Sequence, residues 1–315
     1  MVNPSSLFIA GISGFIGSRL ARRCLTSGYQ VSGMSRGNAE LLSKELGIDV
    51  VKADLLEVSE INSVPLNKSD VIVHCATAND IVSKSFNAGV SLSVMGTRNL
   101  FEAALRAGVK RVVLFSTAQV YGTELFGLVD EFSPVRCETP YALNHFFAEE
   151  LGRLYAEKQG FDVTVIRPSN VYGVPQVSAI NRSTLVPMCF VEEAIKQGSI
   201  TLHSSGKQTR NFVSNDEVAE LVLKVLSSFP TGFTIINACS NYHASIFDIA
   251  GMVASSFKTN YRKKAAIHIN GSQPLSPNVF RYSSKFYSPS ADQSLCSQRM
   301  SSVINQLFVE RMNCK

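Results

Sequence analysis

Short runs of consecutive apolar residues alternate along this chain with stretches in which apolar residues recur every three or four positions. We expect strands over residues 7–10, 29–34, 50–55, 71–76, 111–116 and 162–166, of which 7–10 and 71–76 are the apolar runs typical of buried strands. Helical periodicity predicts helices over 18–25, 88–107 and 141–159, and a last one near 297–309. Strands and helices that alternate at this spacing predict an α/β fold with a doubly wound parallel sheet.

The rhythm changes after residue 173. Pro175, Pro187, Gly198 and Gly206 break the following segment into shorter elements. We therefore expect a doubly wound domain over residues 1–173 and a smaller α/β lobe over 174–315, some segments of which return to the first domain. Such a lobe would cover the carboxyl ends of the strands, where open α/β sheets bind their ligands.

Three glycines, Gly11, Gly14 and Gly17, form the turn between the first strand and the first helix. Backbone N–H groups and the positive end of the helix dipole face outward from such a turn, and glycines leave room for an anion. The arrangement predicts that the diphosphate of a dinucleotide binds here, although a bare glycine triplet also occurs in turns that bind no ligand.

The end of the second strand bears on which dinucleotide would bind. In a dinucleotide fold, an acidic residue at this point binds the adenosine ribose hydroxyls. Ser35 and Arg36 stand there instead. A hydroxyl and a guanidinium suit a 2′-phosphate, so NADP is favoured over NAD; the alternative is that Arg36 is an ordinary solvated residue.

Composition narrows the class of protein. The net charge of +5 is mild and its lysines and arginines are scattered, which argues against a nucleic-acid partner. The seven cysteines contain no C-x-x-C pair, which predicts free thiols in a reducing compartment and no metal site. The first strand begins close to Met1, and no stretch resembles a signal peptide or a membrane span, so we expect a cytoplasmic protein.

Several short motifs follow one another along the chain in an order that indicates a protein family. The glycine turn is followed by Ala53-Asp54-Leu55, by Thr117 after the fifth strand, by Pro140-Tyr141-Ala142-Leu143-Asn144-His145, by Arg167-Pro168-Ser169-Asn170 and by Gly206 to Val213. In this order the chain resembles the extended short-chain dehydrogenase/reductase family, the nucleotide-sugar epimerases and dehydratases. The resemblance implies a Rossmann domain in which Tyr141 is the catalytic phenol and Thr117 hydrogen-bonds the reacting sugar oxygen.

The resemblance also implies two sets of binding residues. The residues expected to bind the coenzyme are Gly11, Gly14, Phe15, Ile16, Gly17, Ser35, Arg36, Asp54, Leu55, Cys75, Ala76, Ser116, Tyr141, His145 and Pro168. Those expected to bind the substrate are Thr117, Asn170, Arg210 and Arg281. Two arginines would account for the affinity for a nucleotide diphosphate, because a guanidinium makes bidentate bonds to phosphate.

One departure from the family pattern concerns the reacting group itself. The family carries a lysine four residues after the tyrosine, which holds the nicotinamide ribose and lowers the pKa of the phenol; here that residue is His145. Three interpretations remain open: His145 takes over the lysine's role with altered catalysis, another cation suffices, or the chain binds a dinucleotide without turnover. We keep His145 as a candidate catalytic residue.

Ala118 and Gln119 narrow the reaction. In the sugar dehydratases of the family, an acidic pair follows the threonine and serves in water elimination, and neither residue here can do so. Epimerisation or carbonyl reduction of a nucleotide sugar is therefore favoured; the alternatives are a catalytically silent NAD(P)-binding regulator and an NADPH reductase of a non-sugar carbonyl.

By analogy with the family, the helices over 88–107 and 141–159 would form a homodimer interface. We expect His74 to be a hydrogen-bonded core residue.

Overall fold

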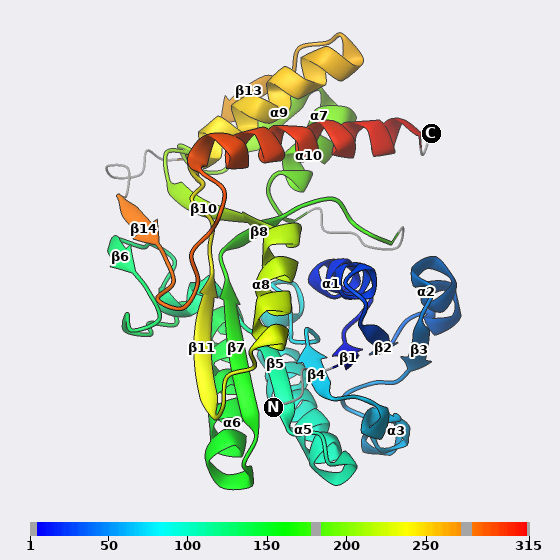
Figure 1. Cartoon of the computed structure of the whole chain (residues 1–315). Helices are drawn as coiled ribbons and strands as arrows, with labels where there is room; N and C mark the ends of the chain where they lie inside the picture. The colour runs from blue at the N-terminus through cyan, green and yellow to red at the C-terminus, as the bar shows by residue number, and fades with distance from the viewer. Residues whose placement is uncertain (1–4, 178–183, 272–278, 314–315) are drawn as a thin grey trace.

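The structure is a computed structural model that describes residues 5–177, 184–271 and 279–313 (Figure 1). Seven strands, all parallel, form the main sheet in the order β11-β7-β5-β4-β1-β2-β3. They are β1 (Ser6–Ala10), β2 (Gln30–Ser35), β3 (Asp49–Lys52), β4 (Val71–His74), β5 (Arg111–Phe115), β7 (Asp162–Pro168) and β11 (Phe233–Ala238). The predicted doubly wound sheet is confirmed, and β11 joins it from the second half of the chain.

Helices cover both faces of this sheet. One face carries α1 (Phe15–Thr26), α2 (Ala39–Leu46) and α8 (Asn215–Ser227), and the other carries α3 (Val58–Ser63), α5 (Gly96–Ala107) and α6 (Pro140–Gln159). Alternate residues of β1 serve the two cores: Leu7 and Ile9 pack on the α1 side, Phe8 and Ala10 on the α5 side. Because both faces are buried, the central strands read as unbroken apolar runs.

The helix expected over 88–107 has three parts. It runs as α4 (Phe86–Val90), a π-helical turn η3 (Ser91–Met95) and α5. The Ser93 hydroxyl in this turn accepts a hydrogen bond from the Ala78 N–H at 2.9 Å, which ties the turn to the segment after β4. π-Helical turns inside helices often lie at functional sites, and this one packs against α6. His74 is buried, with Nε2 2.9 Å from the Thr97 hydroxyl, as expected of a core residue.

The upper lobe packs α7 (Met188–Gln197), α9 (Ile246–Tyr261) and α10 (Gln293–Asn313) around one apolar core. In its small sheets β10 (Thr209–Ser214) lies between β12 (His243–Ser245) and β8 (Asn170–Tyr172), and β13 (Ala266–Ile269) pairs with β9 (Ser199–Leu202). A third pairs β14 (Phe280–Tyr282) with β6 (Gly127–Val129). Short helices η1 (Leu66–Lys68), η2 (Val82–Lys84) and η4 (Ala118–Tyr121) complete the described elements.

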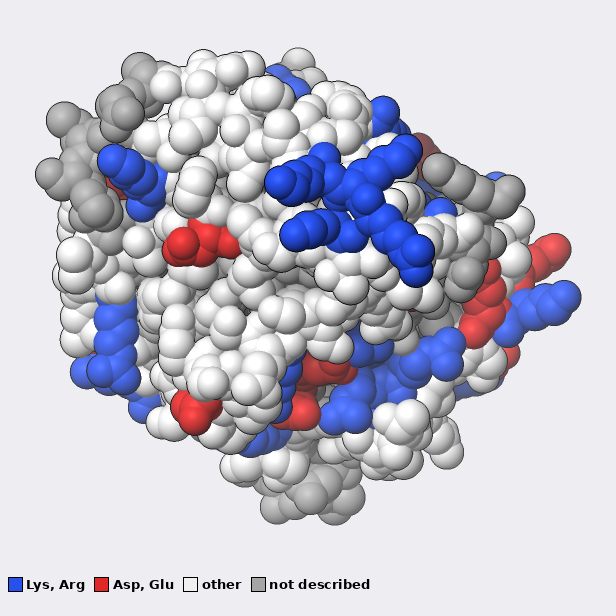
Figure 2. Space-filling view, turned by 90° about the horizontal axis from the view of Figure 1, so that it is seen from above, with Lys and Arg blue, Asp and Glu red and all other residues white. Residues whose placement is uncertain are grey.

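The charged surface of this lobe is patchy. Seen from above, Lys and Arg side chains form several separate groups, with Asp and Glu side chains among them (Figure 2). On this face the charges therefore form no continuous basic stripe. None of the helices in the described ranges is long and apolar enough to cross a membrane.

Candidate functional site

The glycine turn brings three segments into close contact. Gly11 has φ +85°, and a Cβ atom there would lie 2.9 Å from the backbone nitrogen of Ala76, after β4. A Cβ at Gly17 would lie 2.4 Å from the carbonyl oxygen of Gly11. Gly14 is the N-cap of α1 and offers no side-chain cap. The first N–H groups of α1 are thus left for another acceptor, which is the arrangement that binds a diphosphate.

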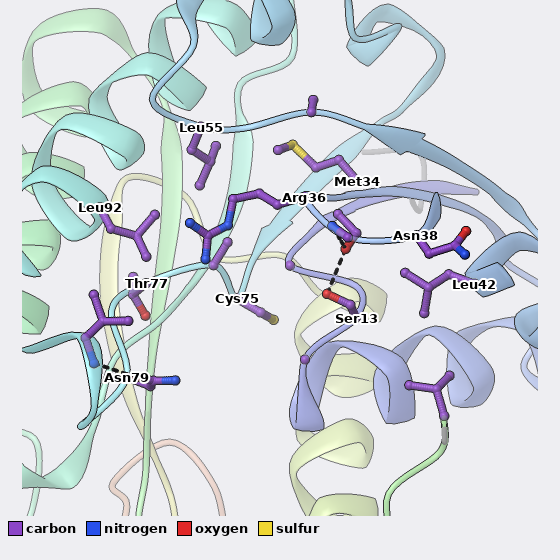
Figure 3. Close-up of a pocket in the computed structure, with 18 of the residues that line it drawn as sticks. Ser13, Met34, Arg36, Asn38, Leu42, Leu55, Cys75, Thr77, Asn79 and Leu92 are labelled. Atoms are coloured by element: carbon purple, nitrogen blue, oxygen red, sulfur yellow. Dashed lines mark hydrogen bonds between the residues drawn. The ribbon is translucent and has the colours of Figure 1, made fainter. Parts of the chain in front are cut away.

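A pocket of about 380 Å³ opens beside this turn (Figure 3). Seven of the residues expected to bind the coenzyme line it: Gly11, Gly14, Ser35, Arg36, Leu55, Cys75 and Ala76. Four others lie next to it in sequence but not on its wall: the side chains of Phe15 and Ile16 pack into apolar cores, and Gly17 and Asp54 are also absent from the lining. The pocket therefore gathers the ends of β1, β2, β3 and β4 at one edge of the sheet.

The tip of β2 carries no carboxylate. The Ser35 hydroxyl donates to the Ser13 hydroxyl at 2.9 Å and accepts from the Gly37 N–H at 3.1 Å. Arg36 extends into the pocket near Leu55 and Cys75 (Figure 3), and its guanidinium lies 3.9 Å from the Asp54 carboxylate, a long ion pair. The part of this pocket at the tip of β2 is therefore lined by a hydroxyl and an exposed cation.

The helix α6 begins at the other end of the site. The Thr139 hydroxyl caps it by accepting from the Ala142 N–H at 3.1 Å, and Tyr141 lies in its first turn. One turn later His145 places its ring against that of Tyr141, with centroids 4.5 Å apart at 67°. His145 is 3% exposed, and neither ring nitrogen has a hydrogen-bond partner at normal geometry among the described residues.

The environment of His145 decides its charge. Burial lowers the pKa of His145 to about 4, and the backbone carbonyls of Phe115 and Ala78 oppose this shift only in part. The imidazole is therefore neutral near neutral pH. His145 can accept or donate a hydrogen bond, but it supplies no positive charge to Tyr141.

A buried ion pair joins α6 to the end of β7 next to His145. Glu149, one turn beyond His145, accepts a hydrogen bond from Arg167 Nε at 2.9 Å and a second from Arg167 Nη2, and both side chains are 2% exposed. Ser116 donates its hydroxyl to the same carboxylate, and the Arg167 guanidinium lies 4.8 Å from the centre of the Tyr121 ring. These contacts fix α6, the end of β5 and the end of β7 relative to one another.

A second pocket, of about 210 Å³, lies beyond the ends of β5 and β7. Thr117, Gln119, Pro168, Asn170 and Arg210 are on its wall. The guanidinium of Arg210 donates to the Thr123 carbonyl at 2.8 Å, and burial lowers its pKa while Glu124 acts in the opposite direction. A half-buried cation beside a polar pocket favours an anionic ligand.

Comparisons with known proteins give the family. The model of the NAD dependent epimerase/dehydratase family matches residues 7–239. The chain belongs to this family. It is 32% identical over 228 residues to a UDP-glucose 4-epimerase of Mycolicibacterium smegmatis, which covers 69% of this chain and 71% of that protein.

A second relative and a solved structure are also similar to this chain. A dTDP-D-glucose 4,6-dehydratase of Mus musculus is 31% identical over 217 residues, or 68% of this chain and 59% of that protein. The crystal structure of the UDP-glucuronic acid 4-epimerase of Bacillus cereus with UDP-glucuronic acid and NAD superposes with a TM-score of 0.78 over 96% of this chain and 99% of that one. At 23% identity, this likeness shows the fold alone.

Within this family member, Arg281 lies apart from the other three residues expected to bind substrate. Side chains alternate along β14, so Phe280 and Tyr282 face the second pocket while Arg281 is exposed. Arg281 lines a separate pocket of about 480 Å³ that also contains His243. Phe280 and Tyr282 form a wall shared by the two pockets.

Some lining residues carried no signal in the sequence. The first pocket also contains Ser13, Asn38, Thr77, Asn79 and Leu92, and the second also contains Ser169, Thr209, Asn211 and Tyr282. Ser13, Thr77 and Ser169 follow strands that were expected, so their place at the carboxyl edge could have suggested them. Phe280 and Tyr282 come from β14, a strand that the sequence pattern does not reveal.

Proposed function

We propose that the chain is an NAD(P)-dependent enzyme that exchanges a hydride with a nucleotide-activated sugar, as a 4-keto reductase or a 4-epimerase. The observation that carries this proposal is the position of the Tyr141–His145 turn. His145 is close enough to the carbonyls of both Ala78, after β4, and Phe115, before Thr117, for each to act on its pKa. The first turn of α6 therefore lies between the ends of β4 and β5, where the two pockets approach each other along the sheet edge.

The residues of the first pocket fit a dinucleotide. The glycine turn would hold its diphosphate, and Leu55 and Ala53 would contact the adenine. His145 is not on the wall of this pocket; one nitrogen of its neutral ring would accept a hydrogen bond from a ribose hydroxyl. When bound, the nicotinamide supplies or accepts the hydride. The protein's own groups handle the proton: Tyr141 exchanges it with the sugar oxygen, and Thr117 hydrogen-bonds that oxygen.

The second pocket supports a nucleotide sugar rather than a small carbonyl compound. Arg210 would bind the diphosphate, and Asn170, whose amide already donates to the Asn211 carbonyl at 2.9 Å, would line the sugar. Ala118 and Gln119 follow Thr117 in η4 and offer neither an acid nor a base, so water elimination is disfavoured.

The test is hydride exchange between NAD(P)H and UDP- or TDP-linked keto sugars. A Tyr141→Phe protein is expected to lose turnover by about 10²- to 10⁴-fold while still binding coenzyme. Tyr155→Phe is the matched control, because Tyr155 lies on the same helix but its hydroxyl bonds Glu102, in α5. Undiminished turnover by Tyr141→Phe would refute the proposal, and coenzyme binding without any hydride exchange would favour a silent regulator.

We also propose a preference for NADP, since Ser35 and Arg36 line the ribose end of the pocket without a carboxylate between them. Arg36→Ala should weaken NADPH binding by about tenfold and barely change NADH binding. Calorimetry with both coenzymes measures this. Equal losses for the two would show that Arg36 does not meet the 2′-phosphate.

A homodimer through α5 and α6 is a further part of the proposal. These helices and the adjoining turns expose large apolar side chains, among them Met95 (44%), Phe147 (39%) and Leu154 (44%). Burial of such a surface in a partner would remove it from water. Phe147→Glu combined with Leu154→Glu should convert the dimer to a monomer in light scattering; a monomeric wild-type protein would refute this part.

A further inference from the structure

We propose that Asn237 is a positioning residue for the second pocket: its side-chain amide holds two walls of that pocket in the places that the nucleotide sugar needs. This inference rests on the proposed function and gives a role to a residue remote from the ligand. Asn237 lies near the end of β11, is fully buried, and is absent from the described walls of both the first and the second pocket.

One wall of the second pocket is formed by η4 and the residue before it. The Thr117 hydroxyl caps this short helix by accepting from the Gln119 N–H at 3.2 Å, and both residues line the pocket. The helix ends at Tyr121, which is 7% exposed and donates its hydroxyl to Asn237 Oδ1 at 2.9 Å. The bond to Asn237 therefore fixes the far end of the element that begins with Thr117.

Another wall of this pocket is formed by Phe280 and Tyr282 of β14. Asn237 Nδ2 donates to the carbonyl of Ser283, directly after this strand, at 2.9 Å. A carbonyl can only accept a hydrogen bond, so the amide nitrogen must face Ser283 and the amide oxygen must face Tyr121. One side chain thus bonds both walls, and a leucine of similar size could form neither bond.

The backbone of Asn237 gives this side chain a fixed base. β11 is the outermost strand of the main sheet, and the β6–β14 pair lies beside it (Figure 1). The Asn237 N–H donates to Glu131 Oε1 at 2.8 Å, and Glu131, which follows β6 and is 9% exposed, also accepts from the Ser284 hydroxyl and from the Lys285 N–H at 2.9 Å. These bonds attach the β6–β14 pair to the edge of the sheet.

The two walls should serve different steps of the proposed reaction. Thr117 would contact the reacting oxygen, so a small shift of η4 should lower kcat, because misplaced reacting groups lose much of their rate. Phe280 and Tyr282 would contact the substrate equally before and during the reaction, so a shift of β14 should raise KM and leave kcat unchanged. A residue that held both walls would affect both constants.

The first experiment removes one hydroxyl. Tyr121→Phe breaks the bond from η4 to Asn237, and it should lower kcat for the reduction of a UDP-linked 4-keto sugar by NADPH about tenfold with little change in KM. Tyr242→Phe is the matched control, because Tyr242 is 4% exposed and its hydroxyl donates to the Met252 sulfur at 3.4 Å, in the core of the upper lobe. Both variants should lower the urea midpoint, but only Tyr121→Phe should lower kcat.

The second experiment removes both bonds. Asn237→Leu should lower kcat as Tyr121→Phe does, raise KM about tenfold, and weaken the binding of UDP in calorimetry by a similar factor. NADPH binding should stay unchanged, because the two pockets share none of their described lining residues. In the Asn237→Leu background, Tyr121→Phe should lower kcat no further, since the bond it removes is already lost.

Three results would overturn the inference: a wild-type kcat in Tyr121→Phe, a double variant whose two losses simply multiply, and an equal loss of UDP and NADPH binding in Asn237→Leu. If Asn237→Leu does not fold, the comparison of Tyr121→Phe with Tyr242→Phe decides. Absence of hydride exchange by the wild-type protein would instead refute the proposed function. The inference would then be judged by UDP binding, and an unchanged UDP affinity in Asn237→Leu would overturn it.

Discussion

Removing the charge of Glu149 is expected to destabilise the protein far more than removing the charge of its neighbour Glu150. Glu149 Oε1 and Oε2 accept two bonds from Arg167 and one from Ser116, and the pair is 2% exposed on both sides. Glu149→Gln leaves the Arg167 guanidinium buried without a counter-charge, which costs about 3–5 kcal/mol. Glu150→Gln breaks a pair with Arg153 whose side chains are 36% and 39% exposed, worth about 0.3–0.5 kcal/mol.

The assay is urea unfolding of both variants by circular dichroism, with slopes compared to confirm that only stability has changed. The double variant Glu149→Gln with Arg167→Met removes the stranded charge and should recover much of the loss. Equal unfolding midpoints for Glu149→Gln and Glu150→Gln would refute the reasoning, because burial is the only large difference between these two carboxylates on one helix.

Two other predictions use matched positions. Gly17→Ala should severely destabilise the protein, because its Cβ atom would lie 2.4 Å from the Gly11 carbonyl oxygen. Gly251→Ala in α9 is the control: its Cβ atom would meet nothing within 4 Å, so we expect it to raise stability by up to about 1 kcal/mol in thermal unfolding. Acidification should also destabilise the protein, because the pKa of His145 falls to about 4 on folding and the unfolded chain therefore takes up the proton first as pH drops below about 6.5. His145 contributes roughly 3 kcal/mol to the stability lost between there and pH of about 4, and buried His74, whose pKa is lowered to about 3, adds to the loss. His145→Gln should flatten this pH dependence of the urea midpoint, and an unchanged slope would contradict it.

The sequence predicts the main sheet well because burial on both faces requires an apolar sequence in its central strands. Strands buried on both faces must be apolar throughout, so β1, β4 and β5 are visible as runs. The third strand is shorter than expected: β3 ends at Lys52, and Ala53 and Leu55 leave the sheet to line the first pocket. The π-helical turn at Ser91–Met95 is not visible in the pattern, since it depends on a tertiary hydrogen bond between Ser93 and Ala78.

The parts of the site that backbone geometry defines could be predicted from the sequence. The parts that depend on which side chains become buried could not. The close approach at Gly11 needs a glycine, so the residue type itself reports the contact with Ala76. The orientation of Arg281 depends on the register of β14, which places it opposite Leu128 and away from the second pocket. The neutral state of His145 depends on its enclosure by segments after β4 and β5, which no local pattern in the sequence encodes.

One face of α6 carries both a residue that stabilises the fold and residues proposed to take part in the reaction. Tyr141, His145 and Glu149 follow one another at four-residue spacing. Because Arg167 pairs with Glu149 inside the protein, the pair contributes to stability, whereas Tyr141 and His145 form the turn at which the proposed chemistry takes place. Loss of stability in Glu149→Gln and loss of turnover in Tyr141→Phe should therefore arise independently. If folded Glu149→Gln protein lost turnover as severely as Tyr141→Phe, the buried pair would have to be counted as part of the proton-transfer machinery.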